Sequence, residues 1–235
     1  MFMKNKLNRI ILLLCLSLFV CLADAEAAQL ETITKVLDID DYRGTVCDYK
    51  GDITGSSFSL NDEMVTLQPQ LRVKNQLGYK KIAGGCIKLM SQDGSHEYVS
   101  FPIGNEESVQ AYKIHADTGR EFLLVKVILG AADGSSSFVN FWLIGKNGEE
   151  YVTYATKETL DKAGLLYDDL AINIKAGQLE MMGYSRLYGN GSFFGNSKFK
   201  GRRYRRVFWK YGTVGSLYFF WDDKANWFGY RLVNV

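Results

Sequence analysis

The chain has 235 residues, with 28 Lys and Arg against 26 Asp and Glu, 14 Tyr, 14 Phe, 4 Trp, 23 Gly and only 2 Pro. No segment is proline-rich or of low complexity, which excludes a disordered linker, and the aromatic residues and glycines favour strands and turns over helices. Beyond the N-terminal region, the sequence contains no apolar run of about eighteen residues. It therefore predicts no transmembrane helix in the rest of the chain.

The first 27 residues have the layout of a secretory signal peptide. Three cations lie within the first nine residues, an apolar run follows at 10–22, and alanines are then spaced for cleavage after Ala27 or, alternatively, after Ala25. At about 1.5 Å per residue, the run is too short to cross a bilayer core of about 30 Å. We therefore predict a single β domain over 28–235 that is exported to the periplasm or the extracellular space.

Two cysteines, Cys47 and Cys86, remain after the leader is removed. In an oxidising compartment we expect them to form a disulfide, which would stabilise the fold by roughly 4 kcal/mol on the chain-entropy model. Two separately buried thiols are the alternative. No ligand spacing connects the cysteines with His96 and His115, so the sequence predicts neither a metal site nor a cofactor.

Short strand-like segments alternate with turn signals along the mature chain. Asp93-Gly94 and Asn147-Gly148 predict hairpin turns with positive φ at both central residues, and Thr156 is placed to cap one short helix near 157–163. The expected strands are 44–50, 64–67, 71–73, 82–90, 121–129, 137–144, 171–175, 179–184, 205–211, 215–221 and 227–232, with 30–41 as a strand or a short helix. The pattern predicts an all-β sandwich or barrel of roughly a dozen short antiparallel strands with one short helix.

Charge is strongly segregated along the chain. Residues 28–180 hold 15 Lys and Arg against 22 Asp and Glu, a net charge of −7, whereas residues 181–235 hold 10 against 2, a net charge of +8. No acidic residue occurs between Glu180 and Asp222. Such asymmetry between the two parts of a chain indicates a binding surface or an internal charge pairing.

The basic segment 197–211 is the best candidate for a ligand-binding site, because seven of its fifteen residues are cationic and five are aromatic. Arginine binds phosphate and carboxylate groups bidentately, and aromatic faces stack on rings. The expected partners are an anionic envelope polymer, a lipid head group or an acidic protein surface, while nucleic acid fits the chemistry but not the compartment. Alternatively, the cations only solvate an edge strand or pair with the acidic part of the chain. The candidate binding residues are Arg202, Arg203, Tyr204, Arg205, Arg206, Phe208 and Lys210.

Catalysis has little support in the sequence, because no serine-hydrolase, zinc-protease or phosphate-loop motif is present. The aromatic stretches 218–221 and 227–230 are expected to form core, with a sugar-stacking platform as the alternative. We therefore predict a non-enzymatic, exported binding or interaction protein of the cell envelope. The alternatives are a secreted hydrolase that uses His96 or His115, a small outer-membrane β-barrel, and an assembly partner that binds through exposed edge strands.

Overall fold

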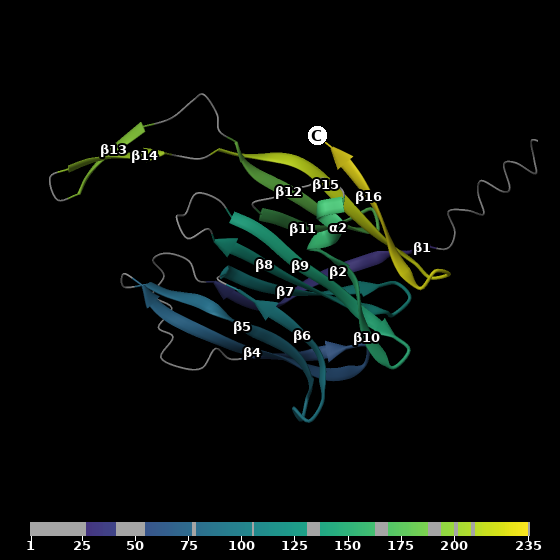
Figure 1. Cartoon of the computed structure of the whole chain (residues 1–235). Helices are drawn as coiled ribbons and strands as arrows, with labels where there is room; N and C mark the ends of the chain where they lie inside the picture. The colour runs from purple at the N-terminus through teal and green to yellow at the C-terminus, as the bar shows by residue number, and fades with distance from the viewer. Residues whose placement is uncertain are drawn as a thin grey trace, which may run out of the picture.

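The structure is a computed structural model that describes residues 27–40, 55–76, 79–104, 106–130, 137–162, 169–187, 194–199, 202–207 and 210–234. The described residues form three stacked antiparallel sheets, a separate two-stranded sheet and one short helix (Figure 1). The predicted all-β class with a single short helix is therefore confirmed, and the three stacked layers make the fold a sandwich.

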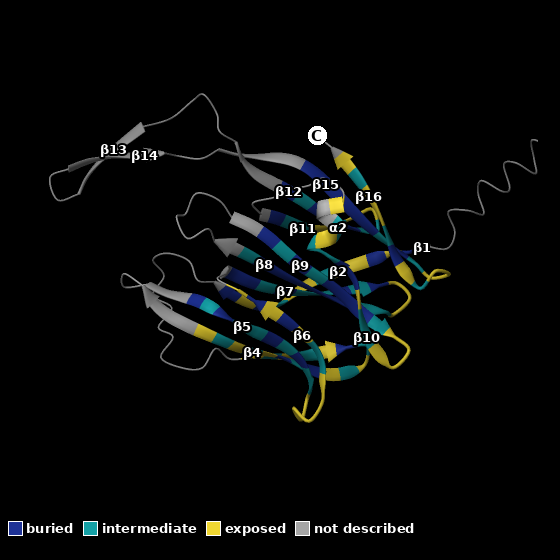
Figure 2. Cartoon of the chain, viewed as in Figure 1, coloured by how far each residue is buried: buried dark blue, intermediate teal, exposed yellow. Residues whose placement is uncertain are grey.

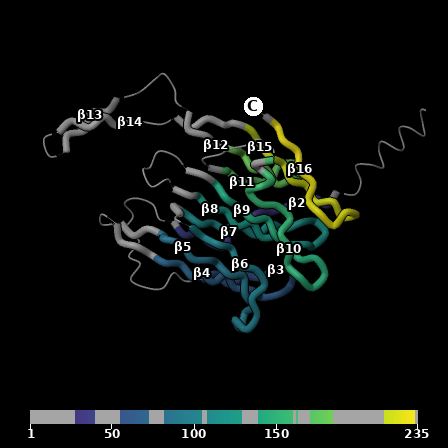
Figure 3. The backbone as a smooth tube through the Cα atoms, viewed as in Figure 1, coloured from purple at the N-terminus to yellow at the C-terminus, as the bar shows by residue number. Residues whose placement is uncertain are grey.

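Each layer is a continuous run of hydrogen-bonded strands. The central sheet has the order β10-β9-β8-β7-β2, and its strands are β2 (Leu30–Asp40), β7 (Glu106–Ala116), β8 (Glu121–Gly130), β9 (Ser137–Asn147) and β10 (Glu150–Thr156). The N-terminal sheet, in sequence order, consists of β3 (Ser56–Leu60), β4 (Glu63–Gln76), β5 (Tyr79–Ser91) and β6 (Glu97–Ile103). The C-terminal sheet has the order β1-β15-β12-β11 with β16 also on β15, and its strands are β1 (Ala27–Ala28), β11 (Asp169–Lys175), β12 (Gln178–Leu187), β15 (Lys210–Asp222) and β16 (Trp227–Asn234). Figure 3 follows the chain through these layers.

Strand β8 shows why one sheet lies between the other two. Every residue from 122 to 127 is buried. Leu123 and Val125 belong to the core against the N-terminal sheet, whereas Phe122 and Leu124 belong to the core against the C-terminal sheet. A strand that is apolar on both faces is stable only when both faces are covered. Figure 2 shows the resulting concentration of buried residues in the central layer.

One charged residue interrupts this apolar run. Lys126 is only 5% exposed, and its Nζ donates to the backbone oxygen of Leu170 in β11 at 3.0 Å. A buried ammonium requires hydrogen-bond acceptors to offset its lost hydration, and the bond connects the central sheet with the C-terminal sheet.

The N-terminal sheet has one apolar and one polar face. In β4, Val65 and Leu67 are fully buried in the core, while Gln68 on the opposite face is exposed. Strand β4 is longer than the sequence pattern predicted, because residues 68–70 between the expected pieces 64–67 and 71–73 also pair regularly with β5, and an irregularity in this pairing lies between Leu71 and Val73. The predicted strand at 44–50 lies outside the described residues.

Two of the two-residue turns between paired strands have left-handed backbone at both of their central residues. Asn61 and Asp62 join β3 to β4 with φ of +50° and +64°, and Ala176 and Gly177 join β11 to β12 with φ of +48° and +70°. Positive φ at both central residues is the type I′ geometry, whose twist matches that of the paired strands. The turn expected at residues 176–177 is confirmed.

The turn between β9 and β10 differs from its prediction. Asn147 is the last residue of β9 and pairs with Glu150, so Gly148 and Glu149 form the turn, and of the three residues 147–149 only Gly148, at +65°, has positive φ. Glycine at the first central position is typical of type II′, which twists the strands in the same sense as type I′.

Helix α2 (Lys157–Lys162) confirms the expected helix and its cap. Thr156 Oγ1 accepts a hydrogen bond from the Glu158 backbone N–H at 3.3 Å, and Thr159 Oγ1 accepts one from the Thr156 N–H at 3.3 Å. This reciprocal arrangement satisfies N–H groups that a helix start otherwise leaves free. Within the described residues, no helix has the length and apolar character needed to cross a membrane.

Candidate functional site

Five of the seven predicted binding residues lie on one strand of a separate hairpin. Strand β13 (Phe194–Phe199) pairs with β14 (Arg202–Val207) in antiparallel register, and among the described strands these two pair only with each other. The register sets Lys198 opposite Arg203 and Asn196 opposite Arg205. Since successive strand residues occupy opposite faces, the positions of Arg203 and Arg205 share one face of the ribbon, and both faces carry cationic positions.

The remaining two predicted residues do not join this group. Phe208 lies outside the described residues, and Lys210 begins β15 and pairs with Leu187 of β12. The expectation of a single strand over 205–211 is therefore wrong. Residues up to Val207 pair with β13, whereas residues from Lys210 onward pair with β12. The change of partner strand depends on tertiary structure, so a local strand pattern could not reveal it.

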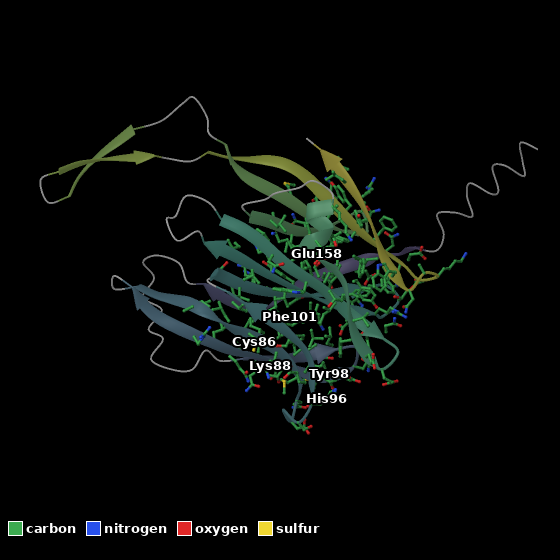
Figure 4. All side chains as sticks on the ribbon, viewed as in Figure 1. Cys86, Lys88, His96, Tyr98, Phe101 and Glu158 are labelled. Atoms are coloured by element: carbon green, nitrogen blue, oxygen red, sulfur yellow. The ribbon has the colours of Figure 1, made fainter. Side chains whose placement is uncertain are left out.

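Cys86 lies on β5, where it is half-buried, and its Sγ is 3.8 Å from Gln70 Oε1 (Figure 4). Its predicted partner, Cys47, lies outside the described residues. The disulfide stays a prediction.

A polar cluster on the outer face of the C-terminal sheet was not predicted. Glu180 of β12 and Tyr218 of β15 are cross-strand neighbours, and both are buried, at 4% and 9% exposure. The Tyr218 hydroxyl donates to Glu180 Oε1 at 2.5 Å, and the Lys175 ammonium lies 3.4 Å from both oxygens. The Lys175 ammonium donates hydrogen bonds to the Tyr218 oxygen and, as the second cause, to the Glu180 carboxylate, and these bonds raise the pKa of Lys175 above its ordinary value of 10.5.

Arg231 completes this cluster from the neighbouring strand β16. Its guanidinium carbon lies 4.9 Å from the centre of the Tyr218 ring, and its Nη2 donates to Gln178 Oε1 at 3.2 Å. Lys175 Nζ lies 5.8 Å from the same ring centre. Two cations therefore approach one tyrosine, with a single buried carboxylate beside it.

The aromatic stretch 218–221 divides between the two faces of the sheet. Phe219 and Trp221 are completely buried in the core, as expected. Phe220 is on the opposite face, where its ring covers Gly229 so closely that an added Cβ would lie 2.4 Å from it. Trp227 is 45% exposed, and its ring packs against Tyr154 at 4.9 Å between centroids. The core interpretation therefore holds for alternate residues only.

A second polar cluster joins the N-terminal sheet to the central sheet. Asn61 Nδ2 donates to the Glu121 backbone oxygen at 3.0 Å, the Glu121 N–H donates to Asn61 Oδ1 at 2.9 Å, and the Asn61 N–H donates to Glu121 Oε2 at 2.8 Å. Lys113 Nζ lies 2.9 Å from Glu121 Oε1. Burial opposes ionisation of Glu121, but the hydrogen bonds from Lys113 and Asn61 outweigh it and lower the pKa below 4.5.

The two histidines stand in different surroundings. His115 is partly exposed, with Nδ1 3.5 Å from Glu121 Oε1 and Nε2 3.9 Å from Glu31 Oε2. His96 is exposed and packs against the Tyr98 ring. Within the part of the chain that the structure describes, no group of three or more His, Cys, Asp or Glu could hold a metal ion.

Asp93, Ser91 and Ser95 lie together in the β5–β6 turn because the two serine hydroxyls donate hydrogen bonds to the Asp93 carboxylate. The Asp93 carboxylate accepts from Ser91 Oγ at 2.5 Å and from Ser95 Oγ at 2.8 Å, and these bonds, with that of the Ser95 N–H, lower the pKa of Asp93 to about 2. The His96 N–H in turn donates to Ser91 Oγ at 3.0 Å. These contacts close the turn and give no nucleophile–base geometry.

Comparison of the chain with protein-family models, with curated proteins and with solved structures gave no match, so function has to be argued from the residues themselves.

Proposed function

We propose that this protein is an exported, non-enzymatic binding protein whose β13–β14 hairpin contacts an anionic polymer, head group or acidic protein surface of the cell envelope. The observation that carries the proposal is the hairpin itself. Its second strand contains Arg202, Arg203, Arg205 and Arg206, and its strands pair with no other strand of the described chain. An isolated two-stranded ribbon contributes little stability of its own, and so many adjacent cations favour a ligand-binding role over a structural one.

The position of the hairpin in the chain supports this proposal. It connects β12 to β15 and lies within residues 181–235, which have a net charge of +8. The more acidic residues 28–180 supply the whole central and N-terminal sheets. The two strands of the hairpin themselves hold five cations and no acidic residue, so positive charge is concentrated in the hairpin.

Export rests on the leader sequence, and the first described strand bears on its cleavage. Ala27 and Ala28 form β1 and pair with Asp222 and Trp221 of β15. Cleavage after Ala25 would keep both residues of β1, whereas cleavage after Ala27 would remove one, so the pairing supports the earlier of the two sites. In an oxidising compartment the mature chain would also form the Cys47–Cys86 disulfide.

The proposal is tested by replacing Arg203, Arg205 and Arg206 with Ser. We expect retention on an anionic resin and on purified envelope polymer to weaken roughly tenfold or more, because each charge-assisted contact contributes about 1 kcal/mol or more, and binding of the unmodified chain should weaken as salt screens the charges. A matched control replaces the exposed cations Lys162 and Lys224 with Ser. Equal retention of the unmodified chain and the arginine variant would refute the proposal.

A further inference from the structure

The outermost strand of the C-terminal sheet, β16, has a free edge. It pairs with β15 from Trp227 to Asn234 without an irregularity, and no other described strand pairs with it (Figure 1). In an antiparallel ladder, every second residue of such a strand directs its N–H and C=O away from its partner. Strand β16 therefore presents a row of backbone donors and acceptors to which a further strand could bind.

The other edges of the three stacked sheets carry features that oppose further pairing. Strands β1 and β3 are short, with two and five residues, and β6 contains Pro102, which has no N–H. Strand β2 carries four charged residues and pairs irregularly with β7 at two places. Strand β10 pairs irregularly with β9, and β11 begins and ends with a charged residue. Strand β16, in contrast, has a single charged residue, Arg231, and no proline.

Strand β16 also carries most of the exposed large apolar side chains of the described chain. Trp227, Tyr230 and Val233 are 45%, 46% and 44% exposed. Met64 of β4 is the other such residue. Tyr230 pairs with Phe219, a core residue, and the two ring centres are 6.0 Å apart, so Tyr230 is on the core face of the sheet. Its ring stays exposed because it lies at the edge, and a strand added along β16 would cover it.

The three exposed residues are spaced symmetrically about Tyr230. When two copies of β16 pair antiparallel around a two-fold axis at this residue, positions equally far before and after it lie opposite one another. Tyr230 of one copy then faces Tyr230 of the other, and each Trp227 faces a Val233. Aromatic pairs and aromatic–β-branched pairs are favourable cross-strand neighbours. The strand is therefore complementary to a second copy of itself.

Charge favours the same arrangement. In the antiparallel register, Arg231 of one copy lies opposite Gly229 of the other, so the two guanidinium groups do not face each other. A parallel arrangement would set each Arg231 beside its own copy, where like charges repel. Strand β16 has no further charged residue that would disturb the antiparallel pair.

We propose that the protein forms a symmetric dimer in which the β16 strands of two copies pair antiparallel about Tyr230 and join the two C-terminal sheets. Phe228 and Leu232, which pack in the core, lie opposite each other across this pair and extend the core from one copy to the next. One strand pair of seven residues is only roughly 24 Å long, so we expect a dissociation constant on the order of 10 μM. The inference does not rest on the proposed function, because no residue of the β13–β14 hairpin takes part.

The experiment measures sedimentation velocity and light scattering of the mature chain from about 1 to about 200 μM, a range that includes the expected dissociation constant. The variants are Tyr230→Lys and Tyr230→Glu. Since residue 230 faces itself in the dimer, each variant alone sets two like charges opposite one another, whereas an equimolar mixture sets Lys opposite Glu. Val233→Lys is a further variant on the same edge. Met64→Lys is the matched control, because it adds the same charge at an equally exposed apolar position of β4. Circular dichroism confirms that each variant is folded.

We expect the unmodified chain to become dimeric over this range and to remain so in about 0.5 M salt, because apolar contacts and backbone hydrogen bonds hold the pair. Tyr230→Lys and Tyr230→Glu should each weaken association about tenfold or more, because an aromatic pair is lost and a like-charge pair is gained. Val233→Lys should also weaken it. The mixture of the two Tyr230 variants should regain the dimer, and Met64→Lys should leave association unchanged.

A chain that stays monomeric at the highest concentration would overturn the inference and leave the edge of β16 for a strand of another protein. A dimer that the Tyr230 and Val233 variants leave intact would also overturn it, and failure of the mixed Tyr230 variants to associate would rule out pairing about Tyr230. Retention on an anionic resin, measured in parallel, depends on the hairpin. A monomer that is still retained therefore contradicts the dimer alone, whereas a dimer that is not retained contradicts the proposed function alone.

Discussion

Replacing Asn61 with glycine tests whether the Asn61–Glu121 contact holds the N-terminal sheet against the central sheet. Glycine keeps the positive φ of +50° without strain and keeps the backbone bond to the Glu121 carboxylate. It removes the two bonds made by the Asn61 side chain, to the Glu121 N–H and to the Glu121 oxygen. The substitution therefore isolates the contribution of the side chain.

The expected loss is about 2 kcal/mol, because two partly buried hydrogen bonds at about 1 kcal/mol each are lost together. For a chain of this size that loss lowers the midpoint of thermal unfolding by about 6 °C. The measurement is thermal and urea unfolding followed by circular dichroism. Asp62→Gly is the control, since Asp62 is the exposed neighbour in the same turn with φ of +64°. It should be neutral or slightly stabilising.

If Asn61→Gly unfolds at the same temperature and urea concentration as the unmodified chain, the contact does not join the two layers. A destabilisation of Asp62→Gly equal to that of Asn61→Gly would show that the effect comes from glycine in the turn and not from the lost bonds.

Three more predictions follow from the same structure. Ala176→Gly should raise the unfolding free energy by about 1 kcal/mol, because it relieves a left-handed residue with φ of +48°, whereas Ala171→Gly within β11 should lower it in the same urea titration. Because the pKa of Glu121 is lower in the folded chain than its ordinary value of 4.5, ionised Glu121 contributes to the free energy of unfolding. This contribution is fully present above about pH 4.5 and is lost as the pH falls through the folded-state pKa. Urea unfolding between pH 7 and pH 3 should show the loss in the unmodified chain but not in Glu121→Gln. Gly145→Ala should cost about 1–3 kcal/mol in thermal unfolding, because its Cβ would meet the Phe122 ring at 2.5 Å; a stable variant would mean that the core can move aside.

Much of the secondary structure could be predicted because its causes are local. The Thr156 cap precedes a real helix, and residues 176–177 form a real turn, since caps and turns depend on a few adjacent residues. The strand expected at 121–129, which is apolar on both faces except at Lys126, is β8. This pattern also explains why β8 is internal, because no solvated outer strand would be apolar on both faces.

Strand β7 was missed for a reason that the pairing shows. Val109 and Ala111 face one core, Ile114 and Ala116 face the other, and pairing with β2 and β8 is irregular along the strand. The buried apolar residues therefore occupy odd-numbered positions in the first half of the strand and even-numbered positions in the second half. The sequence consequently shows no simple alternation of apolar and polar residues.

The sequence by itself determined the all-β class, the helix, most of the turns and the concentration of positive charge after residue 180, because these depend on neighbouring residues and on composition. Only the tertiary structure decided that Arg202–Val207 pairs with β13 while Lys210 pairs with β12, and that Glu180 is buried beside Tyr218 on an outer face. The partner of a strand and the residues that bury a side chain both come from segments far apart in the chain. Neither can therefore be predicted from a local sequence pattern.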